Sequence, residues 1–263
     1  MVEKYDIIGK NYNTTRKPDP YLTDRIMHHL SPIKSGRYLD IGCGTGNYTT
    51  ALFSKGVNIL GIDPSITMLQ SAQKREATIK WLQGIAEDIP VENEAIDGIV
   101  ATLTIHHWEN RSAGFKELHR VLKPNGKLVI FTSTPEQMQG YWLNHYFPEM
   151  LNNSAIQMPS LESVYHDLKA ASFELSGTEP YTIKEDLQDL FLYAGKHNPK
   201  LYLDPNVRSG ISSFSALAHM KEIESGLQKL SQDIRTNKIN EVISEYENNL
   251  GDYLFVIATK INQ

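Results

Sequence analysis

Two carboxylates and a run of glycines carry the strongest chemical signal in the sequence. Residues 38–41 are a short apolar run that contains Asp40, and Gly42, Gly44 and Gly46 follow it with the spacing G-x-G-x-G. Glycine adopts tight left-handed turns and lets the backbone approach a ligand, and the pattern after these glycines is helical. We therefore predict a buried strand that ends in a ligand-binding turn at the N-terminus of a helix.

A second acid follows the next predicted strand. Residues 59–62 form another short apolar run, and Asp63 comes directly after it. In nucleotide-binding α/β folds, an acid at this point binds the two ribose hydroxyls. The glycine turn and this acid together indicate a site for an adenosine-like cofactor.

The glycine spacing bears on which cofactor binds. A dinucleotide fingerprint, G-x-G-x-x-G, requires a third glycine where Asn47 stands, whereas this chain has Gly46 one residue earlier. Asp40 at the strand end would repel a pyrophosphate, but it suits a ligand that carries a positive amino group and a sulfonium. A nicotinamide-dependent oxidoreductase is therefore disfavoured and stays open as an alternative.

Residues 39–46 resemble the first motif of the class I S-adenosylmethionine-dependent methyltransferases, and residues 61–69 resemble the second. The resemblance covers about residues 5–132 and the last predicted strand. It implies that S-adenosylmethionine is the cofactor, that Asp63 binds the ribose and that Met68 packs against the adenine. The residues that it places at the cofactor in these two motifs are Asp40, Gly42, Cys43, Gly44, Gly46, Asp63, Pro64 and Met68.

A third motif departs from the family. Residues 83–90 resemble it, but Ile85 stands where an adenine-binding Asp is usual. The resemblance then leaves the Ala86 backbone and the Glu87 carboxylate as expected contacts for the adenine. We expect only modest selectivity for adenine as a result.

Residues 99–108 resemble the fourth motif, which lines the methyl-transfer channel and includes Thr102 and Leu103. His107 is our first candidate for a general base and His106 the second, because both follow the fourth predicted strand at the mouth of the site. The alternative is that His107 only packs or bonds the backbone. A carboxylate or thiolate acceptor would need no base at all.

The N-terminal residues 12–16 resemble an aromatic-then-arginine segment that closes over the cofactor in this family. The resemblance implies that Tyr12 contacts the cofactor. Arg16 is expected to pair with the methionine carboxylate, since a guanidinium binds a carboxylate through two parallel hydrogen bonds. The alternative for Arg16 is a solvent-exposed surface residue.

Composition limits the partners. The chain has 263 residues, a net charge of −5 and no basic run, which disfavours nucleic acid as a partner. The single cysteine, Cys43, excludes an internal disulfide, and no apolar run approaches the length that spans a bilayer. We expect a cytoplasmic protein, monomeric or homodimeric, without membrane contact. No metal is expected, because no Cys or acid joins His28 and His29, or His145 and His166, at ligand spacing.

Alternating strand and helix patterns predict the elements that position these residues. Strands are expected at residues 37–41, 58–63, 79–83, 96–102 and 127–132, within 173–183, and at 251–260. The fold class is therefore α/β, a Rossmann-like doubly wound, mostly parallel seven-stranded sheet. Residues 1–135 are expected to form the cofactor-binding core with N-terminal lid helices, and residues 160–184 and 251–263 to complete its sheet.

Two insertions, residues 136–159 and 185–250, fall before and after the sixth strand and have helical spacing. We predict that they form a helical cap over the carboxyl ends of the strands, and the alternative is an oligomerisation surface. Four aromatic residues could wall a substrate pocket or simply pack: Tyr141, Trp142, Tyr146 and Phe147. Arg208 is a further candidate, as an anchor for an acidic substrate group.

These observations together predict methyl transfer from S-adenosylmethionine to a small molecule. The expected acceptor atom is an oxygen, or the acceptor is a carboxylate. A protein that binds the cofactor without turnover is the first alternative, and the nicotinamide oxidoreductase is the second.

Overall fold

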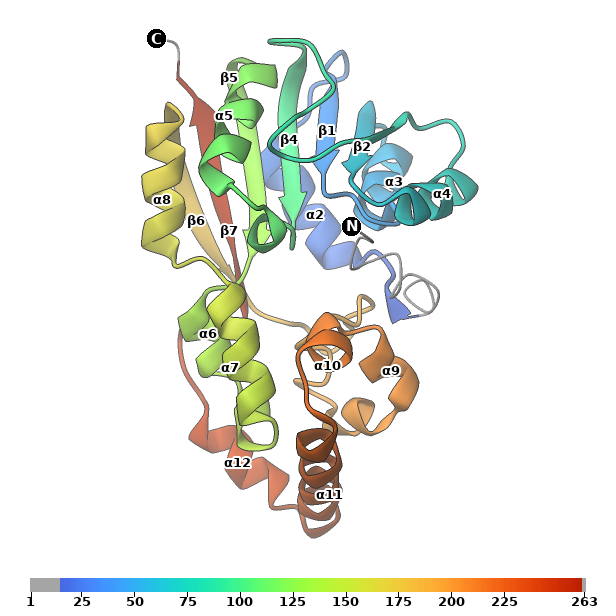
Figure 1. Cartoon of the computed structure of the whole chain (residues 1–263), viewed down its shortest axis with the longest axis vertical. Coiled ribbons are helices and arrows are strands. Elements are labelled where there is room, and N and C mark those ends of the chain that lie inside the picture. The colour runs from blue at the N-terminus through green and yellow to red at the C-terminus, as the bar shows by residue number, and fades with distance from the viewer. Residues whose placement is uncertain (1–14, 262–263) are drawn as a thin grey trace.

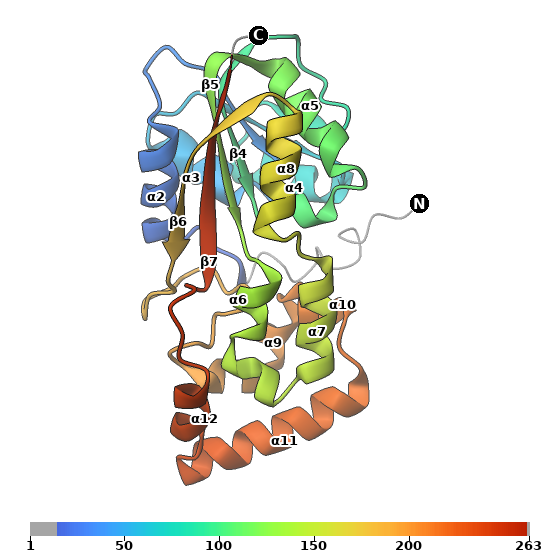
Figure 2. The same cartoon turned by 90° about the vertical axis from the view of Figure 1, so that its left-hand side faces the viewer.

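The computed structural model describes residues 15–261 and contains a seven-stranded sheet with helices on both faces (Figures 1 and 2). The strands are β1 (Tyr38–Ile41), β2 (Ile59–Asp63), β3 (Trp81–Gln83), β4 (Ile96–Thr102), β5 (Leu122–Thr132), β6 (Phe173–Tyr181) and β7 (Tyr253–Lys260). They lie in the order β3-β2-β1-β4-β5-β7-β6, and among them only β7 runs antiparallel to its neighbours. This confirms the predicted Rossmann-like, mostly parallel sheet.

The strand order reverses between β1 and β4, which are hydrogen-bonded to each other. From β1 the chain proceeds outward to β2 and β3 on one side, and from β4 to β5 on the other. In open α/β sheets, ligands bind beyond the carboxyl ends of the strands at such a switch point. The glycine turn after β1 and the segment after β4 meet there.

Within residues 15–261, five helices cover the sheet. They are α2 (Pro20–Leu30), α3 (Asn47–Ser54), α4 (Ile66–Arg75), α5 (Arg111–Val121) and α8 (Leu161–Ala170). Figure 2 shows α2 and α3 on one face and α5 and α8 on the other. Polar side chains fix where several of them begin, because they accept hydrogen bonds from otherwise unpaired N–H groups. The capping residues are Asp19 for α2, Ser65 for α4, Asn110 for α5 and Ser160 for α8.

The fifth strand begins earlier than the sequence predicts. The sequence predicts a strand at residues 127–132, but β5 already starts at Leu122. Its pairing with β4 shifts register between Ile96 and Gly98, and Asn125 adopts a left-handed φ of 62°. Residues 123–126 therefore form an irregular part of the strand.

The remaining helices form the cap, which lies beyond the carboxyl ends of β4 and β5 (Figure 1). The first insertion contributes α6 (Pro135–Gln139), η2 (Trp142–His145) and α7 (Pro148–Gln157). The second contributes η3 (Pro199–Leu203), α9 (Pro205–Ser209), α10 (Ser212–Ala216), α11 (Met220–Thr236) and α12 (Ile239–Glu245). One continuous apolar core joins the cap to the α2 face of the sheet, since Phe131 and Phe255 of the sheet belong to the same cluster as Leu143 and Leu230 of the cap.

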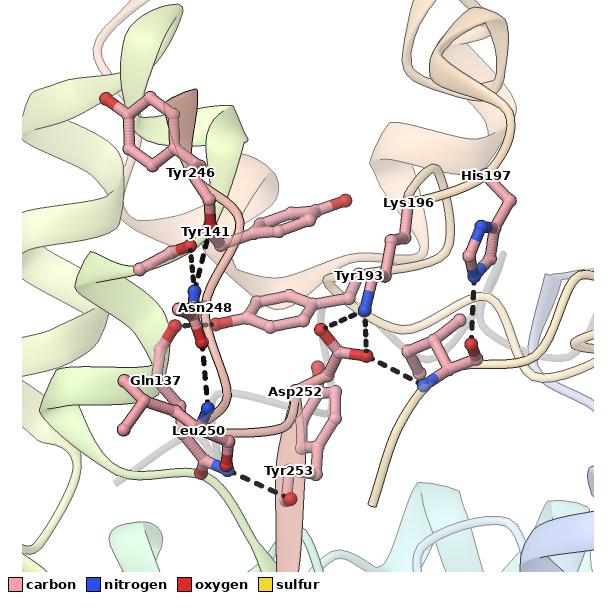
Figure 3. Close-up of polar contacts among 12 residues, drawn as sticks. Gln137, Tyr141, Tyr193, Lys196, His197, Tyr246, Asn248, Leu250, Asp252 and Tyr253 are labelled. Carbon is pink, nitrogen blue, oxygen red and sulfur yellow. Dashed lines mark hydrogen bonds and ion pairs between the residues drawn. The ribbon is translucent and has the colours of Figure 1, made fainter. Parts of the chain in front are cut away.

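Polar contacts fix the junction between the cap and the sheet (Figure 3). The Gln137 amide donates hydrogen bonds to the carbonyl oxygens of Leu250 and Tyr253, at 3.0 and 2.9 Å. Lys196 forms an ion pair of 2.7 Å with Asp252, whose carboxylate also accepts from the Ile183 N–H. Both insertions are therefore attached to the start of β7.

Candidate functional site

The turn after β1 uses its glycines for two different reasons. Gly42, Gly44 and Gly46 all have left-handed φ values, of 69°, 54° and 74°. A Cβ on Gly42 would lie 2.0 Å from Thr104 Oγ1, whereas a Cβ on Gly44 would meet nothing within 4 Å. Gly42 thus allows the turn to pack closely against the segment after β4, and Gly44 faces open space.

Asp63 holds this turn in place. It is the last residue of β2, and its carboxylate accepts hydrogen bonds from the Gly44 N–H at 2.8 Å and the Ser65 N–H at 2.9 Å. The side chain is buried, with 8% of the residue exposed, yet it lines a cavity. One carboxylate therefore fixes the glycine turn, starts the next helix and borders the space in front of both.

Asp40 is a buried carboxylate at the site with a shifted pKa. It is buried in β1 and accepts a hydrogen bond of 2.6 Å from the Thr49 hydroxyl. Burial raises the pKa of Asp40 to about 7, the Thr49 hydrogen bond opposes this shift, and the Asp63 carboxylate adds to it. A cation beside Asp40 would stabilise its charged form.

The cavity at the switch point has a volume of about 340 Å³. Eleven of the residues that the sequence placed at the site line it: Arg16, Asp40, Gly42, Cys43, Gly44, Asp63, Pro64, Met68, Thr102, Leu103 and His107. They come from segments separated by up to 91 positions in the chain, and the topology of the sheet brings them together. Tyr12, also expected at the cofactor, lies outside the described residues.

Three expected site residues do not line the cavity. Gly46 lies against β3, because a Cβ on it would meet the Trp81 ring at 2.5 Å. Ala86 is buried in the core on the α5 side of the sheet, and the Glu87 carboxylate accepts a hydrogen bond from the Asn110 N–H at 2.9 Å. The Ile85 side chain is exposed. The adenine contacts of Ala86 and Glu87 stay a prediction.

The cavity wall contains polar atoms that a ligand could satisfy. Thr45 Oγ1, Asn47 Oδ1 and Thr102 Oγ1 are buried and have no hydrogen-bond partner among the described residues. All three residues line the cavity. Because buried polar atoms are nearly always hydrogen-bonded in folded proteins, this wall fits a ligand with several polar groups, such as S-adenosylmethionine.

Arg16 is partly buried and forms an ion pair with Asp189 of the second insertion. The exposed fractions of the two side chains are 13% and 0%, and Tyr48 donates a hydrogen bond of 2.9 Å to the same carboxylate. Asp189 could not be recognised from the sequence, since a single acid 173 positions away from Arg16 carries no motif. This contact links the N-terminal segment, the cavity wall and the cap.

His106 and His107 lie in η1 (Ile105–His107), directly after β4, and both line the cavity. Their ring centroids are 3.9 Å apart. His107 is the more exposed of the two. Leu103, just before them, has a left-handed φ of 51°, a strained conformation for a leucine of the kind that clusters at functional sites.

The cap supplies the other half of the cavity wall. Its lining residues are Met138, Met158, Phe191, Leu192, Ile211, Ser212 and Ser213, together with Tyr253 from β7. The four aromatic residues considered for this role, Tyr141, Trp142, Tyr146 and Phe147, pack in the apolar core instead. Arg208 does not line the cavity either, and it donates a hydrogen bond to the Tyr202 carbonyl.

The described residues contain neither a membrane-crossing helix nor a metal cluster. Within residues 15–261, none of the helices combines the length and the apolar character needed to cross a membrane. No group of three or more His, Cys, Asp or Glu side chains in the same range could hold a metal ion.

Comparison with known proteins places this site in a family context. A model described as a methyltransferase domain matches residues 39–130. A crystal structure from Anabaena variabilis, provisionally described as a methyltransferase from an antibiotic biosynthesis pathway, is 32% identical, with a TM-score of 0.83 over 94% of this chain and 99% of that one.

Sequence relatives of the chain are also methyltransferases by name. A ubiquinone/menaquinone biosynthesis C-methyltransferase of Geotalea daltonii is 30% identical over 160 residues, which cover 55% of this chain and 68% of the relative. An uncharacterized methyltransferase of Mycobacterium tuberculosis is 31% identical over 112 residues, or 43% of this chain and 46% of that protein. The chain thus spans about half the length of the first curated relatives that it matches.

Proposed function

We propose a function for this chain, which belongs to the class I S-adenosylmethionine-dependent methyltransferase family. We propose that it transfers a methyl group to an oxygen of a small-molecule acceptor, either a hydroxyl or a carboxylate. The observation that carries this proposal is the continuous cavity, which runs from Gly44 and Asp63 at the strand ends to Met158 and Ile211 in the cap. One space can therefore hold a cofactor against the sheet and an acceptor against the cap.

The chain's residues fit this cofactor. Asp63 would bind the ribose hydroxyls, Met68 would pack against the adenine, and the Gly44 backbone would lie beside the ligand. Asp40 would pair with the ammonium group of the methionine moiety. The bound cofactor supplies a methyl group already activated on a sulfonium, so the protein has to bind and orient the two reactants and exclude water.

The carboxylate of the cofactor has one candidate partner in the described residues. Arg16 lines the cavity, and Asp189 already holds its guanidinium. The guanidinium has five N–H donors, so it can keep Asp189 and still donate to a second carboxylate. We propose that Asp189 orients Arg16 toward the cofactor.

A hydroxyl acceptor has to lose a proton. We propose His107 as the group that takes it and His106 as the second candidate, because both imidazoles line the cavity after β4. A His107→Gln variant should then lose turnover by at least about 100-fold while keeping its cofactor affinity. Near-normal turnover would mean that His107 only packs.

Two other functions stay as alternatives to test. A protein that binds the cofactor without turnover would have the same cofactor half, and the nicotinamide oxidoreductase lacks support from the family. A cytoplasmic location and a monomeric or homodimeric state stay predictions of the sequence.

Calorimetric titration tests the cofactor directly. We expect S-adenosylmethionine and S-adenosylhomocysteine to bind with micromolar affinity and NAD not to bind. Asp63→Ala should abolish both affinities, because it removes the ribose ligand and the acceptor for the Gly44 N–H together. Asp24→Ala, at an exposed position of α2, is the matched control and should bind like the wild type. Binding of NAD alone would overturn the proposal.

A further inference from the structure

The cap side of the cavity forms a chamber with a mainly apolar wall. We define the acceptor chamber by Met138, Met158, Leu192, Ile211 and Tyr253, which line the cavity and belong to the two insertions and the start of β7. Apart from Met158, which is partly buried, these residues are almost completely buried. Their side chains offer a bound molecule apolar contact, and the polar groups on the same side of the wall are the Tyr253 hydroxyl and the side chains of Ser212 and Ser213.

The cavity wall offers few counter-charges for an anionic acceptor. Among the described residues that line the cavity, Arg16 is the only lysine or arginine, and it is paired with Asp189. The carboxylates on the wall, Asp40 and Asp63, belong to the cofactor half. Apart from Arg16 and the imidazoles of His106 and His107, an anionic acceptor would meet no cationic group, so the loss of its hydration would be poorly compensated.

Tyr253 is held rigidly at the start of β7. Gln137 Nε2 donates to its carbonyl oxygen at 2.9 Å (Figure 3). Its ring stacks on Phe131, with centroids 5.2 Å apart and an angle of 24°, and it also contacts the rings of Phe191 and Tyr193 at 4.9 and 5.0 Å. The side chain therefore has a fixed direction before any ligand binds.

The Tyr253 hydroxyl makes no hydrogen bond within the described part of the chain. The residue is 2% exposed, yet its hydroxyl forms no hydrogen bond with any part of the chain that the structure describes. Burial holds the pKa of Tyr253 well above its usual range, so the hydroxyl stays protonated and can donate a hydrogen bond at neutral pH. A fixed donor on a cavity wall that has no partner in the described chain can donate to an oxygen of a bound ligand.

We propose that Tyr253 determines acceptor specificity by donating a hydrogen bond to an oxygen of a neutral, largely apolar compound that carries a hydroxyl or carbonyl group. This inference rests on the proposed function and narrows it, because it selects a hydroxyl compound over a carboxylate as the acceptor. The apolar wall binds the body of the molecule, and Tyr253 fixes its orientation.

Tyr181 provides a matched control. It pairs with Tyr253 across β6 and β7, is equally buried at 2% exposure, and its hydroxyl also has no hydrogen-bond partner among the described residues. It does not line the cavity. A Tyr→Phe change at either position removes one hydroxyl that makes no hydrogen bond within the described chain and keeps the ring, so only Tyr253→Phe should affect a ligand in the chamber.

The experiment uses three probes of similar size: 2-naphthol, naphthalene and 2-naphthoate. Their dissociation constants are measured at pH 7.5 on the protein saturated with S-adenosylhomocysteine, for the wild type, Tyr253→Phe and Tyr181→Phe. We expect the wild type to bind 2-naphthol at least about 10-fold more tightly than 2-naphthoate, because the one arginine on the wall is already paired with Asp189. Tyr253→Phe should weaken the binding of 2-naphthol about 3- to 10-fold, and its affinity for naphthalene should stay within twofold of the wild-type value. Tyr181→Phe should change neither.

Three results would overturn the inference: 2-naphthoate binding as tightly as 2-naphthol, an unchanged affinity for 2-naphthol in Tyr253→Phe, or no binding of 2-naphthol to the saturated protein. The titration with S-adenosylhomocysteine separates this failure from that of the proposed function. If the wild type does not bind S-adenosylhomocysteine, the proposed function fails and the inference fails with it. If it binds normally, the probe results decide on the chamber alone.

Discussion

The two halves of the cavity wall are built in different ways. The cofactor half comes mainly from the ends of β1 and β2, where Asp40, Gly44 and Asp63 lie within one βαβ unit. The cap half collects side chains from Met138 to Tyr253, from both insertions and the last strand. Backbone geometry and hydrogen bonds define the first half, and packing of apolar side chains defines the second.

This difference indicates how each half can change. In the cofactor half, one carboxylate serves the turn, the next helix and the cavity at once, so a substitution there disturbs the backbone as well as the ligand. In the cap half, an apolar residue can be exchanged for another of similar volume at a small cost in stability. We therefore expect the cofactor half to tolerate few substitutions and the cap half to adapt to different acceptors.

The largest effect should come from the contact that joins the halves. Asp189→Asn removes the charge that pairs with Arg16 and should lower the free energy of unfolding by about 3 kcal/mol, because it leaves a partly buried cation without its partner. The measurement is urea unfolding. Asp24→Asn is the matched control: its ion pair with Lys55 is exposed, and we expect a loss below about 1 kcal/mol. Equal losses would show that the buried pair contributes no more to the free energy of unfolding than the exposed pair.

A smaller effect should separate two glycines of the same turn. Gly42→Ala forces a Cβ against Thr104 at a left-handed φ and should cost about 2 kcal/mol of unfolding free energy. The Cβ of Gly44→Ala meets no protein atom, so this variant should lose only about 1 kcal/mol of unfolding free energy. It should weaken the binding of S-adenosylhomocysteine at least about 10-fold, because the Cβ enters the cavity. The two measurements are urea unfolding and calorimetry. If Gly44→Ala bound the ligand normally, the turn would not face the cofactor.

The same contrast explains what the sequence could predict. The glycine spacing and the acids after two apolar runs report local backbone geometry, so the sheet, its switch point and most of the cofactor half could be predicted. Asp189 and Tyr253 could not, because each reaches the cavity through packing between distant segments. The aromatic residues at 141–147 were a reasonable choice for a pocket wall, but the apolar core shared by the cap and the sheet takes them up instead.

The pH dependence of cofactor binding should sharpen the role of Asp40. Its folded pKa of about 7 lies above its ordinary value of 3.8, so the folded chain binds this proton more tightly than the unfolded chain does. The contribution of Asp40 protonation to the free energy of unfolding is complete below pH 3.8 and is lost as the pH rises through 7. The ammonium of S-adenosylhomocysteine requires the charged form, so we expect its affinity to rise about 10-fold between pH 6 and pH 8.

Asp40→Asn keeps an acceptor for the Thr49 hydroxyl and cannot ionise. The affinity of this variant for S-adenosylhomocysteine should be lower than that of the wild type at pH 8, and it should not change between pH 6 and pH 8. Calorimetry at matched ionic strength measures both proteins. A wild-type affinity that stays flat from pH 6 to pH 8 would contradict a pairing between Asp40 and the ammonium.

The smallest expected effect compares one methionine from each half. Met158→Ala removes apolar contact from the acceptor chamber and should weaken the binding of 2-naphthol by about 1 kcal/mol, or about fivefold. Its affinity for S-adenosylhomocysteine should stay within twofold of the wild-type value. Met68→Ala removes similar contact at the cofactor half and should show the reverse pattern. Calorimetry with the two ligands on both variants measures this exchange. If each variant weakened both ligands equally, cofactor and acceptor would share one undivided space, and the distinction between the two halves would not hold for binding.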